Sequence, residues 1–303
     1  MYRVIAYSIM KKIFVLLTLL GVLAATIIIF VSCKKEEKVR SLTEELAILN
    51  KDIESQIERA ELSKGKFGKW LAVVGADVIA GWEGGKIGAT IGGIVTGGNP
   101  IGIVVGGAIG GAVCGGGASG LAEQAFSKSI RDPYPNGYIS TLTSRYSDFN
   151  LTGEWHNMYL DLLFKTNFNP DVNTIYNQIF SNSIDKETFD KLMEKVGPNS
   201  KTYNDILSII NDYVRSDYDI NVLLDQFKRN FGMSEETEEI WYSFFNMYSS
   251  VTEIDDAYYV VERYIDFVNE TSARFLKSDE IKSFNCALSV ALHSTNYWSI
   301  LNE

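Results

Sequence analysis

IGIVVGGAIGGAVCGGGASG, residues Ile101 to Gly120, is the stretch that decides how this chain folds. It has nine glycines among its twenty residues and no charged side chain. Glycine is about 1 kcal/mol less favourable than alanine at an interior helix position, so a helix of this composition would not persist while surrounded by water. A helix here therefore needs close contact with other backbone, or a medium in which the backbone has no water to bond to.

Twenty of the 25 glycines in the 303-residue chain lie between Gly65 and Gly120. The block divides at GGNP, residues 97–100. Asparagine is a favourable N-cap and proline is favoured at the first helical position, so Asn99 and Pro100 predict a second helix that runs to about Leu121. We therefore expect a helical hairpin over residues 67–122.

The glycines of this hairpin recur at intervals of four, a pattern that we call a glycine zipper. Spacing of four places residues on one helix face, where missing side chains allow another backbone to approach closely. The predicted helix-packing residues are Gly84, Gly88, Gly92, Gly98, Gly102, Gly106, Gly107, Gly110, Gly111 and Gly115. The pattern predicts packing, and it indicates no chemistry.

The sequence does not determine whether lipid or protein surrounds the hairpin. The second arm has 21 uncharged residues from Ile101 to Leu121, which is long enough to cross a bilayer. The first arm carries Asp77, Glu83 and Lys86, and each charge opposes insertion, although Glu83 and Lys86 are spaced to pair. The hairpin enters lipid, wholly or from about residue 87 onward, or its first arm lines the water-filled interior of an oligomer. The alternative is that the C-terminal part of the chain covers the hairpin.

The block resembles the glycine-zipper segments of bacterial envelope lipoproteins and of bacteriocin-like peptides. This resemblance implies membrane association or self-assembly, so the expected partners are membrane lipid or a second copy of the chain, which would form a homo-oligomer through the zipper. It assigns no catalytic residue. No GxxxxGK[ST] phosphate loop occurs in the chain.

The N-terminus has the pattern of an export signal. Lys11 and Lys12 precede an uninterrupted apolar run from Ile13 to Val31. The FVSC that ends at Cys33 resembles the lipobox of bacterial lipoproteins, which implies a signal peptide over residues 1–33 and lipidation of Cys33. The following KKEE, residues 34–37, resembles a lipoprotein surface-export signal. We expect a lipid-anchored protein of the cell envelope, in the outer membrane or at the cell surface; a plain transmembrane helix is the alternative.

Residues 34–66 are expected to form a stalk. Apolar residues at Val39, Leu42, Leu46, Leu49 and Ile53 follow heptad spacing, with charged residues around them. The two heptads are too few to indicate a coiled coil. We expect one amphipathic helix, within residues 38–63, that packs on the rest of the chain.

Residues 123–150 are expected to form a linker, because RDPYPNGY at residues 131–138 is rich in turn residues. Beyond it, residues 151–303 predict an acidic all-helical domain, which makes the fold class all-α. The expected helices cover 151–166, 171–182, 185–196, 201–216, 219–231, 234–249, 252–276 and 279–300. This part resembles uncharacterised secreted helical proteins in the His156-Asn157 pair and in the Ser294 to Trp298 segment.

Charge is divided unevenly along the chain. Residues 1–122 hold 13 basic and 10 acidic side chains, whereas residues 123–303 hold 15 and 28. Such an acidic C-terminal part does not suit nucleic acid or anionic lipid as a direct partner. Its expected partner is a protein that the sequence does not identify.

Few side chains in the chain could bind a metal or take part in catalysis. His156 and His293 have no carboxylate or histidine at ligand spacing, so a buried histidine bonded to a main-chain oxygen is expected, with no metal and no cofactor. Cys286 and His293 share a helix face, but a small buried cysteine is the favoured interpretation. Whether Cys114 and Cys286 form a disulfide is left open.

These patterns predict a non-enzymatic, membrane-associated envelope lipoprotein. Its hairpin would insert in a bilayer or self-assemble, while the acidic helical domain binds a partner. A pore-forming or bacteriocin-like antibacterial toxin is the alternative. An enzyme built on the helical domain is the least favoured interpretation.

Overall fold

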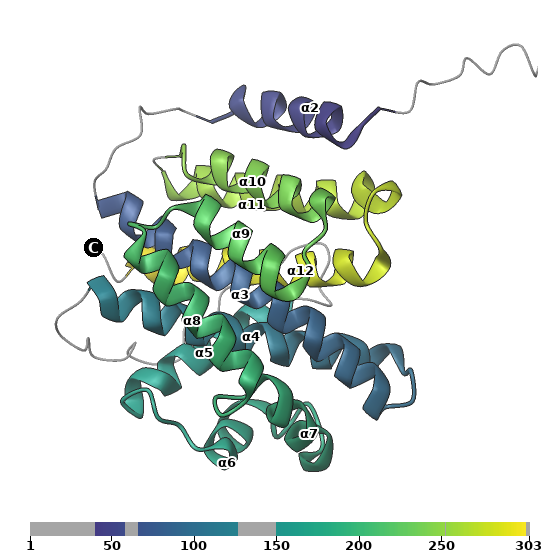
Figure 1. Cartoon of the computed structure of the whole chain (residues 1–303), viewed down its shortest axis with the longest axis vertical. Helices are drawn as coiled ribbons and strands as arrows, with labels where there is room; N and C mark the ends of the chain where they lie inside the picture. Colours follow the sequence, from purple (N-terminus) through teal and green to yellow (C-terminus); the bar gives the residue numbers. More distant parts are fainter. Residues whose placement is uncertain (1–39, 58–65, 127–149, 252, 301–303) are drawn as a thin grey trace, which may run out of the picture. The chain divides into compact units, whose positions relative to one another are not determined.

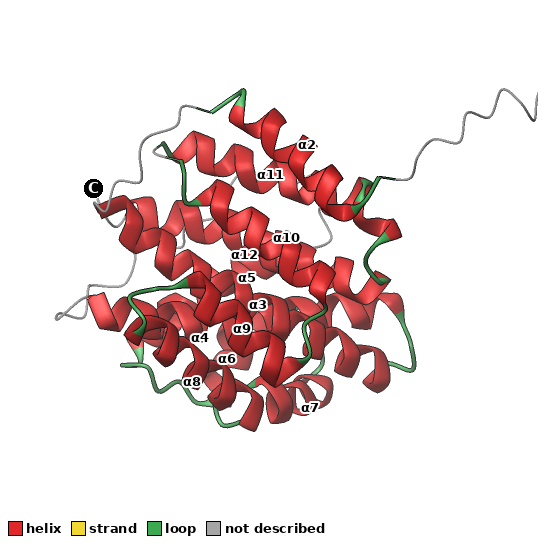
Figure 2. Ribbon diagram, turned by 45° about the horizontal axis from the view of Figure 1, so that its top comes forward, coloured by secondary structure: helices red, strands yellow, loops and turns green. Residues whose placement is uncertain are grey.

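The computed structural model describes residues 40–57, 66–126, 150–251 and 253–300. The described residues form helices and turns without a β-strand, which confirms the all-α prediction (Figure 1, Figure 2). The predicted signal segment with Cys33, the start and end of the predicted stalk, and most of the predicted linker lie outside the described residues.

The helices follow the chain in simple succession. Their bounds are α2 Leu42–Glu54, α3 Lys66–Val95, α4 Pro100–Phe126, α5 Asn150–Lys165, α6 Val172–Ile175, α7 Lys186–Val196, α8 Lys201–Arg215, α9 Ile220–Phe231, α10 Glu235–Tyr248, α11 Ile254–Glu270 and α12 Ser278–Ile300. A π-turn, Tyr176–Phe180, continues α6, and a short 3-10 turn, Ser272–Arg274, follows α11.

Helices α3 and α4 form the predicted hairpin, and other helices pack around it. Helix α4 contacts α5, α7 and α8, and α12 contacts both arms (Figure 1). Residues Leu42–Glu303 form one compact unit. The predicted C-terminal domain, residues 151–303, is therefore not a separate unit, because its core includes the hairpin.

The helices around the hairpin are amphipathic and capped by their own sequence. Ser200 caps α8 by accepting a hydrogen bond from the Tyr203 amide at 3.1 Å, and Asp185 caps α7 at the Thr188 amide at 2.9 Å. The apolar face of α8 is buried, as its spacing predicts: Tyr203, Ile206, Ile209, Ile210 and Tyr213. These helices turn apolar stripes inward and charged residues outward.

Two helix boundaries differ from the predictions. The helix expected over 252–276 ends at Glu270, where Ser272 turns its hydroxyl back to the Val268 carbonyl at 2.6 Å, a local bond that competes with helix continuation. The stalk helix covers only Leu42–Glu54 among the described residues.

Helix α2 packs on α10 and α11, as expected of a stalk that folds onto the chain. Its Asn50 side chain donates to Ser243 at 2.8 Å and accepts from Tyr264 at 2.8 Å. Asp52 pairs with Arg263 at 2.7 Å. Polar contacts thus supplement the buried face of Leu42, Leu46, Leu49 and Ile53.

Candidate functional site: the glycine hairpin

The two arms of the hairpin meet backbone to backbone. A Cβ atom on Gly88 would overlap the Gly106 carbonyl oxygen and lie 3.1 Å from the Gly110 Cα. A Cβ atom on Gly110 would overlap the Gly84 carbonyl oxygen in the same way. No side chain fits at this interface, since backbone occupies the place that the side chain would need.

The same antiparallel match continues toward the turn. A Cβ atom on Gly92 would overlap the Gly102 carbonyl oxygen and lie 3.1 Å from the Gly106 Cα. One on Gly106 would lie 2.9 Å from the Gly92 Cα. At Gly102, the Thr96 side chain fills the space instead. Three facing pairs, spaced four residues apart along each arm, thus hold the arms together.

A second row of small residues faces the surrounding helices. A Cβ atom on Gly81 would lie 3.3 Å from Val290 Cγ2, and one on Gly85 would lie 3.1 Å from Cys286 Cβ, both on α12. Of the predicted packing residues, Gly107, Gly111 and Gly115 lie in this row. The row forms a groove between the arms in which side chains of α5 and α12 pack.

Gly81 and Gly85 were not among the predicted packing residues, although they continue the spacing of four. Gly98 was predicted as a packing residue, and this is wrong. It lies in the turn with φ +86, a Cβ atom there would meet nothing within 4 Å, and its amide donates to the Gly93 carbonyl at 2.7 Å. Its role is to turn the chain, because positive φ strains other residues.

Among the described residues, one helix is long and apolar enough to cross a membrane, the segment Pro100–Ala122 of α4, and most of it is buried in this fold. Helix α4 begins where the Asn99 and Pro100 pair predicts, with the Ile101 amide 3.0 Å from Asn99 Oδ1. The described form is thus the one in which other parts of the chain cover the hairpin.

Glu83 and Lys86, two of the charged residues of the first arm, lie close enough to pair. Glu83 is buried and lies 3.5 Å from Lys86, whose Nζ also donates to the Phe231 carbonyl at 3.1 Å. Burial raises the pKa of Glu83 to about 7, although Lys86 opposes this shift. The predicted pairing of these two residues is confirmed.

Asp77 lies deeper and belongs to a polar cluster formed by three helices. His156 Nε2 of α5 lies 3.6 Å from Asp77 Oδ2, and Ser294 of α12 donates a hydrogen bond to the same oxygen. His293 lies one residue before Ser294, and a Cβ atom on Gly153 of α5 would overlap its ring. We call Asp77, His156, His293 and Ser294 the stem cluster; each is at most 1% exposed.

Burial favours the uncharged form of each titratable group in the stem cluster. It raises the pKa of Asp77 to about 8, with hydrogen bonds from Ser294, Ser119 and Trp298 opposing the shift. Burial lowers the pKa of His156 and of His293 to about 4. Loss of solvation therefore opposes an ion pair between Asp77 and His156, although their side chains lie close together.

The stem cluster is incompletely hydrogen-bonded. His156 Nδ1 bonds to Asn157 Oδ1 at 2.9 Å. The prediction that this histidine bonds to a main-chain oxygen is therefore wrong, because its partner is a side chain. His156 Nε2 and both ring nitrogens of His293 have no hydrogen-bond partner among the described residues. Each such group costs about 1–3 kcal/mol when it is buried without a partner.

The two described cysteines are free thiols, so the disulfide that the sequence left open is not formed in this structure. Burial raises the pKa of the Cys286 thiol to about 12, and it raises that of Cys114 further. The predicted small buried cysteine thus describes Cys286. Among the described residues, no three histidine, cysteine or acidic side chains are grouped so that they could hold a metal ion.

The stem cluster escaped prediction from sequence because Asp77, His156 and His293 come from three separate helices and share no local spacing. The one available signal was a charged residue, Asp77, within an apolar glycine-rich arm. No family model matches the chain, and no curated protein or solved structure is detectably similar to it.

Proposed function

We propose that this protein is a non-enzymatic envelope lipoprotein that carries a membrane-inserting helical hairpin in a water-compatible helical shell. In this account Cys33 bears the lipid and α2 links the anchor to the shell. The α3–α4 hairpin is the working element. It passes into a bilayer or joins the hairpin of another copy, while the acidic outer surface binds a protein partner.

The observation that carries this proposal is the double packing of the hairpin. Its arms hold each other through backbone contacts at Gly84, Gly88 and Gly106, which need no neighbouring helix. The contacts to the shell are made by a second row, which includes Gly81 and Gly85 and also touches the facing arm: a Cβ atom on Gly81 would lie 3.5 Å from the Gly111 carbonyl oxygen. We infer that the hairpin leaves the shell as an intact unit, because the contacts between its arms do not depend on the shell helices.

Transfer of the hairpin from the shell to a bilayer moves α4 from one apolar environment to another. Helix α4 from Pro100 to Ala122 is uncharged and mostly buried in this fold, by α3 as well as by the shell helices. In hydrocarbon its backbone bonds are satisfied within the helix. The first arm resists more, because Asp77 and Glu83 are buried within it. Both have a raised pKa, which reduces the charge that would have to be moved.

A disulfide between hairpin and shell tests this proposal. A Cβ atom on Gly81 lies 3.7 Å from Val290 Cβ, within the range that a disulfide bridges, so Gly81→Cys with Val290→Cys should lock α3 to α12. We expect photoactivatable phosphatidylcholine in vesicles to label the deep part of α4, residues 110–121, in the reduced protein. Oxidation should abolish this labelling, and reduction should restore it.

A matched control joins the two arms to each other. A Cβ atom on Gly107 lies 3.3 Å from Ala89 Cβ, so Gly107→Cys with Ala89→Cys closes a bridge within the hairpin. Both pairs are made with Cys286→Ala, since the native thiol lies 3.5 Å from a Cβ at Gly107. The oxidised control should still be labelled. Equal labelling in the locked and reduced proteins, or none in either, would refute insertion.

The pore-forming alternative rests on one further feature, the amphipathic shell that keeps an apolar hairpin compatible with water. A toxin needs such a soluble form before it reaches its target. If the reduced lock variant releases dye from vesicles and the oxidised form does not, the pore-forming role is favoured. Lipid labelling without dye release favours the anchored envelope role.

A further inference from the structure

We infer that the hairpin tip, residues 90–103, is a docking surface for a zwitterionic phospholipid bilayer. The tip binds the bilayer while the rest of the hairpin is still packed inside the shell. Ile94 and Ile101 are 74% and 71% exposed, the highest values among the exposed large apolar residues of the structure's described part. No charged residue occurs between Lys86 and Glu123. An uncharged projection with exposed isoleucines suits a lipid interface.

The polar side chains of the tip are bonded within the hairpin itself. Thr90 donates to the Lys86 carbonyl at 2.9 Å, and Thr96 donates to the Gly92 carbonyl at 2.6 Å. Asn99 Oδ1 accepts from the Ile101 amide at 3.0 Å. These three side-chain oxygen atoms keep their partners when water is removed, which favours entry into a membrane interface.

The backbone at the turn is also largely self-bonded. The amides of Thr96, Gly97 and Gly98 donate to the carbonyls of Gly92, Ile94 and Gly93, at 3.1, 3.3 and 2.7 Å. These bonds satisfy carbonyls at the end of α3 that would otherwise need water. Few backbone groups of the turn therefore lose a partner when the tip leaves water.

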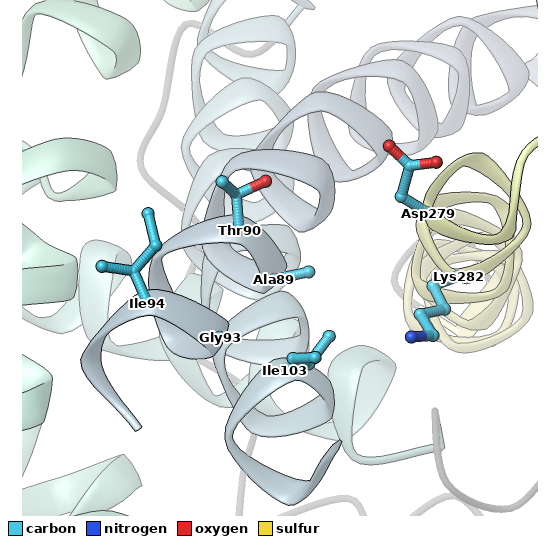
Figure 3. A pocket seen from close by; sticks show the side chains of 7 residues that line it. All are labelled: Ala89, Thr90, Gly93, Ile94, Ile103, Asp279 and Lys282. Atoms are coloured by element: carbon cyan, nitrogen blue, oxygen red, sulfur yellow. The ribbon is translucent and has the colours of Figure 1, made fainter. Parts of the chain in front are cut away.

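A pocket of about 340 Å³ adjoins the tip and indicates the headgroup chemistry. Ala89 and Ile103 point into it from the hairpin, while Asp279 and Lys282 face them from α12 (Figure 3). One acidic and one basic side chain beside an apolar wall match the quaternary ammonium, phosphate and acyl chain of phosphatidylcholine, a zwitterionic phospholipid. This charge pattern is the reason to name a zwitterionic bilayer.

This inference deepens the proposed function, and it is tested in the oxidised Gly81→Cys, Val290→Cys protein so that docking is separated from insertion. An environment-sensitive fluorophore is attached at Ile101→Cys in the full chain, with Cys33 replaced by alanine, and the protein is reconstituted in phosphatidylcholine vesicles. We expect blue-shifted emission and quenching by lipids that carry nitroxide near the headgroup, although the lock prevents insertion.

The matched control carries the label at Ile48→Cys on α2, where the native isoleucine is 48% exposed. It should remain aqueous and unquenched. Adding Ile94→Glu to the tip-labelled protein should abolish the shift, and adding Lys282→Ala should reduce it. A tip label that stays as aqueous as the control on vesicle-bound protein would overturn the inference, whatever the unlocked hairpin does.

Discussion

Gly88→Ala is expected to destabilise the folded protein by about 3 kcal/mol or more, a large loss for one added methyl group. The new Cβ would overlap the Gly106 carbonyl oxygen and lie 3.1 Å from the Gly110 Cα. Backbone atoms cannot rotate away as a side chain can, so the arms must separate and lose contacts along their length. Urea unfolding followed by circular dichroism measures the loss.

Gly81→Ala is the matched control for this prediction. Its Cβ would lie 3.3 Å from Val290 Cγ2 and 3.5 Å from the Gly111 carbonyl oxygen, so it overlaps no backbone atom, and alanine is the better helix former by about 1 kcal/mol. We expect stability within about 1 kcal/mol of the parent protein. If Gly88→Ala were tolerated as well as Gly81→Ala, the arms would not be held by backbone contact.

Asp77→Asn is expected to reshape the dependence of stability on pH. Between pH 4 and 8 the folded protein keeps a proton on Asp77 that the unfolded chain releases, because burial raises this pKa from 3.8 to about 8. Between pH 4.5 and about 7, folded Glu83 likewise keeps a proton that the unfolded chain releases. Both groups make stability fall as pH rises through these ranges, each by at most about 1.4 kcal/mol per pH unit.

The two histidines act in the opposite sense. Their pKa values fall from 6.5 to about 4 on folding, so they make stability fall as pH is lowered through that range. Two carboxyl groups and two histidines thus largely cancel between pH 4.5 and 6.5. Above pH 6.5 only the carboxyl groups contribute, so the parent protein should lose stability from pH 6.5 to 8.

The Asp77→Asn variant lacks one of the two opposing carboxyl groups. Its loss of stability from pH 6.5 to 8 should be smaller than that of the parent protein. Below pH 6.5, it should lose stability on acidification, since two histidines are then opposed by Glu83 alone. Denaturant unfolding at several pH values measures both changes. Asp190→Asn, which removes an exposed carboxyl group on α7, is the control and should follow the parent curve.

Local rules predicted the helices well where each one depends on its own sequence. The cap formed by Asn99 and Pro100 marks the start of α4, and the apolar spacing of Tyr203, Ile206 and Ile210 marks the buried face of α8. The spacing of four among the glycines recurs where the two backbones lie close together, as at Gly88 and Gly106. Each of these signals lies within a few turns of helix.

The remaining features depend on how distant segments meet. The same spacing of four places Gly98 on the zipper, but that residue lies in the turn, because the helix ends before it. Asp77 and His293 are more than two hundred residues apart, and no local pattern links them. The helical shell over the hairpin was an open alternative for the same reason, since uncharged glycine-rich helices suit both a protein core and a bilayer.

The distance between hairpin and shell on a membrane tests the central claim most directly. Spin labels at Ile101→Cys and Glu187→Cys report the separation of the tip from α7, and labels at Thr90→Cys and Ile101→Cys report the hairpin itself. With phosphatidylcholine vesicles, we predict that the first distance lengthens and broadens while the second stays unchanged. If both distances stayed as they are in solution while the protein was bound to vesicles, the hairpin would be a permanent core, and the proposal would be wrong.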